Sequence, residues 1–166
     1  RRENVIRRLV TAVRDAEAFT VAVVHGAVAL RMASPLLACD YRIVSDTTTF
    51  VYASREAPVA PAGGVLWFLS RLVGPATTVE MVLGGAPLGA AEARRLGLAS
   101  FVAPAAEFEA AALAEARRIA ALPSQVLHQL KRSMVASCER LDTYFDREAA
   151  LLVREASSLL RHAEGG

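Results

Sequence analysis

The residues best suited to proton transfer lie between positions 52 and 56. Ser54 and Glu56 are two positions apart, so on a strand their side chains would point to the same face. A carboxylate can give or take a proton, whereas a serine hydroxyl does not titrate near neutral pH. Glu56 is therefore a candidate catalytic residue, and the alternative is that it is a solvated surface residue.

A second group of polar residues follows the apolar run of residues 20–24. His25 occupies a turn with Gly26, where a hydrogen-bonded turn residue is the alternative to a functional one. Arg31 carries a planar guanidinium that suits a phosphate or carboxylate of a ligand. Ser34 before Pro35 is typical of a helix start with serine as the N-cap, and a catalytic role for Ser34 is the alternative.

Composition and charge narrow the function classes. The 166 residues carry 19 basic and 17 acidic side chains in a mixed pattern, which argues against a nucleic-acid partner. The apolar run 21–30 is too short to cross a bilayer, so no membrane segment is expected. Cys39 and Cys138 are too few for a disulfide framework, so a cytoplasmic, reduced setting is expected. No metal site is expected either. The hydrophobic fraction of 54% favours burial between subunits.

The elements that would position these residues follow from periodicity and turn signals. An amphipathic helix is predicted over 2–16 and a strand buried on both faces over 20–24. A short helix then begins at Ser34, and half-buried strands follow over 40–44 and 48–52. Later helices are predicted over 65–73, 77–83, 88–97, 106–122, 124–137 and 141–162, with a short strand over 98–102.

Several motifs in this order resemble those of the crotonase superfamily, the enoyl-CoA hydratase/isomerase-like proteins. His25-Gly26 followed by Cys39-Asp40 is similar to one of its motifs. The residues Phe50, Pro61, Gly64, Arg71 and Gly74 fall at the expected spacings, and the blocks 79–85 and 90–99 continue the match.

This resemblance covers residues 20–104 and implies an α/β fold, the ββα spiral. Residues 1–104 would form the C-terminal portion of the spiral core, and residues 105–166 a helical region for oligomerisation. The N-terminal part of the family's fold would precede Arg1.

The resemblance also implies an acyl thioester ligand, linked to coenzyme A or to a carrier protein. Two backbone N–H groups would hold its carbonyl while an enolate develops, one of them the N–H of Arg31. Leu30 and Met32 stand where the family usually has glycines, and the alternative is that they are core residues. Substrate-binding positions implied in this way are Ala27, Ala29, Gly63, Gly64 and Lys131. Lys131 would contact a CoA phosphate, and the alternative is a solvated helix face.

The family's hydratases use two glutamates, and Ser34 and Ser54 occupy those positions here. Ordinary hydration of an enoyl-CoA is therefore not expected. Enolate chemistry remains, as dehydration, decarboxylation or isomerisation, with no cofactor beyond the thioester substrate. The alternative is a catalytically silent partner subunit in a hetero-oligomer or biosynthetic complex. The resemblance implies a homotrimer or hexamer.

Overall fold

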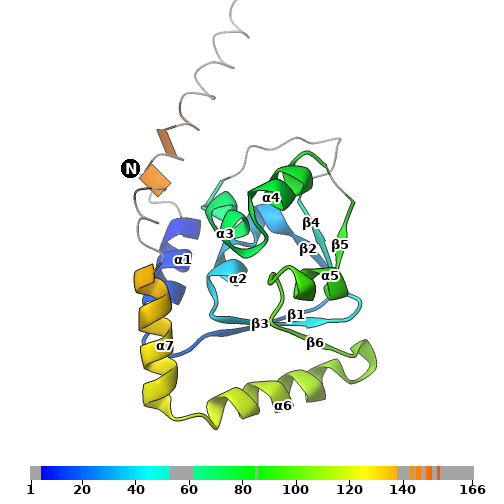
Figure 1. Ribbon diagram of the computed structural model, residues 1–166, viewed down its shortest axis with the longest axis vertical. Helices are drawn as coiled ribbons and strands as arrows, with labels where there is room; N and C mark the ends of the chain where they lie inside the picture. Colours follow the sequence, from blue (N-terminus) through cyan, green and yellow to red (C-terminus); the bar gives the residue numbers. More distant parts are fainter. Residues whose placement is uncertain are drawn as a thin grey trace, which may run out of the picture.

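The described strands form two small sheets of three strands each. The computed structural model describes residues 5–52, 62–84 and 86–137, together with 143, 145, 146, 149, 150 and 153. One sheet has the order β1-β3-β6, from β1 (Val21–Val24), β3 (Tyr41–Ser45) and β6 (Phe101–Ala103), and is parallel throughout. The other has the order β2-β4-β5, from β2 (Ala27–Ala29), β4 (Thr49–Val51) and β5 (Leu88–Gly89). Successive strand pairs thus step from one sheet to the other, and the predicted ββα spiral is confirmed (Figure 1).

The burial of two strands differs from the sequence-based prediction. β1 was expected to be buried on both faces, but it pairs only with β3 among the described strands, and Val23 is 51% exposed. β3 was expected to be half-buried, but it is the central strand, with Arg42 and Ser45 buried alongside Ile43 and Val44. Both predictions are wrong for the same reason: a strand's neighbours decide its exposure, and its own alternation does not report them.

Helices on one side of the sheets form the core with them. α1 (Val5–Asp15) packs on α2 (Ser34–Ala38), and α2 packs on α3 (Val65–Leu72), which is followed by α4 (Pro75–Val82). The largest buried side chains of this core include Leu30, Phe50 and Leu69. Gly26 has a φ of 76° in the turn between β1 and β2, a conformation that costs glycine little. The helices predicted over 2–16, 65–73 and 77–83 are confirmed within the described residues.

The remaining helices surround this core. α5 (Ala90–Arg95) precedes β6, and α6 (Phe108–Ala120) and α7 (Ser124–Ser137) follow a short 3-10 turn, η2 (Ala105–Glu107). In Figure 1, α6 runs beside the β1-β3-β6 sheet and α7 stands beside α1. Most of the helix predicted over 141–162 lies outside the described residues. No helix in the described part of the chain has the length and apolarity to cross a bilayer.

Candidate functional site

The N-terminal end of α2 lies where β2 and β4 both end. These strands run parallel in the register Ala27 with Thr49 through Ala29 with Val51, so their carboxyl ends meet at one edge. The chain leaves β2 into the 3-10 turn η1 (Leu30–Met32) and α2, and it leaves β4 toward Ser54. Because loops at the carboxyl ends of neighbouring parallel strands converge, this edge is a natural place for a site.

The residues of η1 divide between core and surface. Leu30 is fully buried, whereas Arg31 and Met32 are exposed, Met32 by 57%. The interpretation of both Leu30 and Met32 as core residues is therefore correct for Leu30 and wrong for Met32. The Arg31 side chain faces solvent while its backbone N–H lies in the first turn of η1. The first N–H groups of a helical turn lack an intrahelical acceptor, so this N–H is free of an acceptor within η1, and its role in an oxyanion hole stays a prediction.

Ser34 is fully buried at the start of α2, and its hydroxyl has no hydrogen-bond partner among the described residues. The prediction of Ser34 as an N-cap is wrong. Ala33 is the N-cap, and no side chain caps the helix, because Ser34 is already inside its first turn with Pro35. A buried hydroxyl without a partner carries a desolvation cost of about 1–3 kcal/mol. The position is thus well enclosed but holds no titratable group.

The other predicted substrate-binding positions fall into two environments. Ala27 and Ala29 are exposed on β2, and their ligand contact stays a prediction. Gly63 and Gly64 are buried before α3, with φ of 73° and 81°. A Cβ at Gly63 would lie 2.8 Å from Ile6 Cγ2, and one at Gly64 would lie 2.9 Å from Phe145 Cε1. Both glycines therefore allow close packing within the protein. Ser54 and Glu56 lie outside the described residues.

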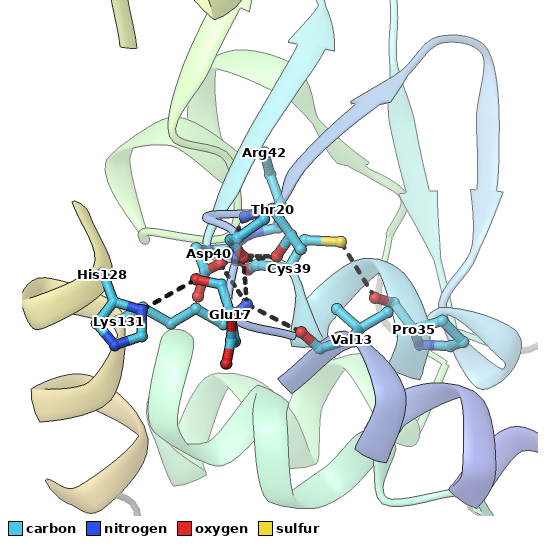
Figure 2. A network of polar contacts seen from close by, with 10 residues as sticks. Val13, Glu17, Thr20, Pro35, Cys39, Asp40, Arg42, His128 and Lys131 are labelled. Atoms are coloured by element: carbon cyan, nitrogen blue, oxygen red, sulfur yellow. Dashed lines mark hydrogen bonds and ion pairs between the residues drawn. The ribbon is translucent and has the colours of Figure 1, made fainter. Parts of the chain in front are cut away.

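The C-terminal end of α2 holds a buried polar network around Asp40 (Figure 2). Asp40 Oδ2 accepts hydrogen bonds from the backbone N–H and the hydroxyl of Thr20, both at 2.7 Å. Lys131 Nζ lies 2.9 Å from the same oxygen and also donates to the carbonyls of Val13 at 2.9 Å and Ala18 at 3.0 Å.

Lys131 is 3% exposed, so the solvated helix face considered for it is wrong. An ammonium has three N–H donors, and all three have acceptors inside the protein. The predicted contact between Lys131 and a CoA phosphate is therefore corrected: the side chain joins α7 to α1 and to the end of α2. Buried charges persist when paired in this way.

The next two residues connect the same corner to other elements. Tyr41 Oη donates to Glu115 Oε1 of α6 at 2.7 Å, and Glu115 also pairs with Arg118 at 2.7 Å. The hydrogen bonds from Arg118 and Tyr41 lower the pKa of Glu115 to about 2. Arg42 is buried and donates to the carbonyls of Leu98 at 2.8 Å, Cys39 at 2.7 Å and Gly97 at 3.4 Å.

His25 and Cys39, both part of the motifs found in the sequence, make few contacts with polar groups. His25 is exposed and makes an edge contact with Phe108, with ring centroids 5.9 Å apart. No hydrogen bond from His25 joins it to the described residues, so the hydrogen-bonded turn considered for it is wrong. Burial raises the pKa of the Cys39 thiol, which contacts the Pro35 carbonyl at 3.5 Å. The described part of the chain holds no cluster of three or more His, Cys, Asp or Glu side chains suited to a metal.

Comparison with known proteins decides the family. The model of the enoyl-CoA hydratase/isomerase family matches residues 2–164. The chain belongs to this family. The predicted resemblance to the crotonase superfamily is thereby confirmed, and the match extends beyond residues 20–104 into the C-terminal helices.

Individual family members show how much of the fold the chain contains. It is 34% identical over 116 residues to a probable enoyl-CoA hydratase of Rhodobacter capsulatus, covering 70% of this chain and 45% of that protein. It is 31% identical over 113 residues to a 4-chlorobenzoyl coenzyme A dehalogenase of an Arthrobacter species, covering 68% and 41%. The crystal structure of an enoyl-CoA hydratase from Mycobacterium avium subsp. paratuberculosis superposes with a TM-score of 0.80 at 33% identity, covering 87% of this chain and 59% of that one. The chain thus spans about half the length of these family members.

Sequence reasoning missed most of the buried charges at the C-terminal end of α2. Arg42 was expected on the solvent face of an alternating strand, and nothing local distinguishes it from a surface arginine. Glu115 and Arg118 carried a usable signal, since opposite charges three positions apart on a helix form a pair. Asp40 was recognised only as part of a motif, and its partner Lys131 is 91 positions away.

Proposed function

We propose that this chain forms part of a crotonase-type site that binds an acyl thioester of coenzyme A or of a carrier protein. In this proposal the backbone N–H of Arg31 donates to the thioester carbonyl oxygen as an enolate develops. The observation that carries the proposal is the convergence of β2 and β4 beside the first turn of η1. A fixed donor of this kind contributes about 3–4 kcal/mol to a developing oxyanion.

The reaction we propose is an enolate reaction other than enoyl-CoA hydration. Ser34 stands at one glutamate position of the hydratases, and it is fully buried with no hydrogen-bond partner for its hydroxyl among the described residues. A general acid or base must change protonation during the cycle, which a serine hydroxyl does not do near neutral pH. The enolate reactions that we propose instead are dehydration, decarboxylation or isomerisation. In each of them a residue of the segment after β4, such as Glu56, would carry the proton. No cofactor is needed beyond the thioester.

The test compares two substitutions at one exposed position. Arg31→Ala keeps the backbone N–H, whereas Arg31→Pro removes it. The assay is hydrogen–deuterium exchange at the α-carbon of hexanoyl-CoA, followed by mass spectrometry, with circular dichroism to establish that both variants fold. We expect Arg31→Ala to exchange at the rate of the parent and Arg31→Pro at least about 100-fold more slowly. Equal rates in the two variants, or no exchange by the parent, would contradict the proposal.

A second candidate is the catalytically silent partner subunit. The observation that favours it is the buried, non-titratable Ser34 together with bulky Leu30 and Met32 in η1. This candidate expects hexanoyl-CoA to bind without α-carbon exchange. Calorimetric binding by a chain that exchanges nothing, with exchange restored by an added homologue that co-purifies with it, would favour the silent subunit.

We also propose that the chain self-associates through exposed apolar residues of α7. Val126, Leu130 and Met134 follow one another at intervals of four residues on α7, and they are 54%, 48% and 56% exposed. An apolar stripe of this kind on a helix is typically covered by another helix. We propose that it contributes to a homotrimer or hexamer, and light scattering at micromolar concentration is the measurement that checks it.

A further inference from the structure

A cavity of about 400 Å³ lies at the C-terminal end of α2, away from Arg31 and Ser34. Its walls come from α1, α2, the start of β3, α3 and α7. Apolar side chains form much of the lining, among them Leu37, Phe68, Leu130 and Met134. This volume falls within the usual range for small-molecule sites, which are mostly apolar with a few polar groups that orient the ligand.

Two arginines that line this cavity contact the ring of Trp67, the one tryptophan of the chain. Trp67 is 4% exposed, and two guanidinium groups lie over its ring. The Cζ of Arg71 is 3.9 Å from the ring centroid and that of Arg14 is 5.0 Å from it. Cation–π contacts of this kind place two positive charges at the same aromatic ring, and both arginines line the cavity.

The side chains that line the cavity carry more positive than negative charge. Lys131 and Asp40 pair with each other, and Arg42 is held by three backbone carbonyls. Arg14 and Arg71 have no carboxylate partner among the described residues. Arg71 Nη1 donates to the carbonyl of Trp67 at 3.1 Å, and Arg14 Nη2 lies 3.5 Å from the carbonyl of Val135.

One guanidinium nitrogen of Arg14 lacks a hydrogen-bond acceptor among the described residues. This nitrogen, Nη1, is buried. Buried donors without an acceptor are rare in proteins, and each one calls for an explanation such as a missing ion or ligand. A buried guanidinium nitrogen without an acceptor, in a cavity lined by a second arginine that has no carboxylate partner among the described residues, is an environment that an anion would complete.

We propose that this cavity binds a small amphipathic carboxylate. The carboxylate accepts from Arg14 Nη1, with Arg71 also at the cavity wall, and the apolar body packs against Leu37 and Phe68. A carboxylate suits the site because its two oxygens match the planar fork of a guanidinium. This site is separate from the thioester site at the other end of α2, and it does not rest on the function proposed there.

The fluorescence of Trp67 reports occupancy directly, because the chain has a single tryptophan. We expect octanoate to change the emission saturably, and octan-1-ol, which has the same carbon count but no charge, to bind at least about tenfold more weakly. Arg14→Gln should weaken octanoate binding about tenfold or more, the equivalent of one charge-assisted hydrogen bond, and leave octanol binding unchanged. Arg117→Gln, at an exposed position on α6, should change neither titration.

Arg14→Lys provides a second variant in case Arg14→Gln does not fold, as judged by circular dichroism. It keeps the charge but loses the fork, and it should bind octanoate more weakly than the parent. Equal affinity for octanoate and octanol, no saturable change, or unaltered octanoate binding in the folded Arg14 variants would overturn the proposal. It would also be overturned if Trp67 emission depended on protein concentration alone and light scattering showed a dimer that the Arg14 variants dissociate. In that case a carboxylate of a second copy occupies the cavity.

Discussion

The two ends of α2 differ in their polar contacts, although Ser34 and Cys39 are only five positions apart. At the C-terminal end, Asp40, Tyr41 and Arg42 each bond to a different distant element: α7, α6 and the α5–β6 connection. At the N-terminal end, Arg31 and Met32 face solvent, and the Ser34 hydroxyl has no partner among the described residues.

This difference separates the parts of the molecule that maintain the fold from the part that would carry out the reaction. A buried charge without its partner is strongly destabilising, so Asp40 and Lys131 depend on each other. The Ser34 hydroxyl has no partner among the described residues, so a substitution there is not expected to disrupt the fold. Comparing substitutions at the two ends therefore tests whether the division holds.

The largest effect is expected from Lys131→Met at the C-terminal end. The substitution keeps an apolar side chain of similar length but leaves Asp40 without its ammonium partner. We expect the free energy of unfolding, measured with urea, to fall by about 3–5 kcal/mol. Arg132→Met, at an exposed neighbouring position, is the control and should change it by less than about 0.5 kcal/mol. Similar values for the two variants would show that the network is not a stabilising one.

Arg42→Met tests how much the hydrogen bonds from Arg42 to backbone carbonyls stabilise the C-terminal end of α2. The substitution keeps the buried stem and removes the donors to Leu98, Cys39 and Gly97. We expect a loss of about 2–4 kcal/mol in the same urea experiment, because buried carbonyls are left unsatisfied. Arg94→Met on the exposed face of α5 is the matched control. A loss no larger than that of the control would show that water replaces the guanidinium.

Glu115→Gln tests the contact between Tyr41 and α6 through the pH dependence of the free energy of unfolding. The pKa of Glu115 is lowered to about 2 in the folded protein, chiefly by Arg118 and then by Tyr41. A lowered carboxyl pKa adds stability above the pKa of the unfolded chain, and this stability is lost as the pH falls through the folded value. Because Arg118 is 62% exposed, solvent screening limits the contribution to about 1 kcal/mol at pH 7.

The measurement is the difference in unfolding free energy between the parent and Glu115→Gln from pH 7 down to pH 2. We expect the difference to shrink steadily below the ordinary carboxyl pKa. Glu109→Gln, at an exposed position on α6, should show no such trend. A difference that stays constant with pH would mean that Glu115 acts through packing and not through its charge.

The smallest effect, with the opposite sign, is expected at the N-terminal end. Ser34→Ala removes a buried hydroxyl that lacks a partner, so thermal unfolding should show unchanged stability or a gain of up to about 1 kcal/mol. Ser45→Ala is the control, because the Ser45 hydroxyl is also buried but lies 3.0 Å from the Thr47 hydroxyl. Its removal should cost about 1 kcal/mol. Destabilisation by Ser34→Ala as large as that of Ser45→Ala would reveal a partner for Ser34.

Local signals predicted most of the secondary structure. Gly74 and Pro75 mark the boundary between α3 and α4, and Pro123 precedes α7, because glycine and proline constrain the backbone wherever they occur. The strand β2 was missed, since its three residues are too short for a periodic pattern. Within the site, Ser34 was predicted as the N-cap of α2, but Ala33 holds that position, because capping depends on one residue of register.

The sequence by itself determined the family and the order of the elements, because motif spacing and turn residues are properties of the chain alone. Only the tertiary structure decided that β3 is central and β1 is at an edge of the described sheet, that Lys131 is buried beside Asp40, and that Arg14 and Arg71 both contact the ring of Trp67. Burial and charge pairing arise between residues far apart in the chain, and no local pattern encodes which of them will meet.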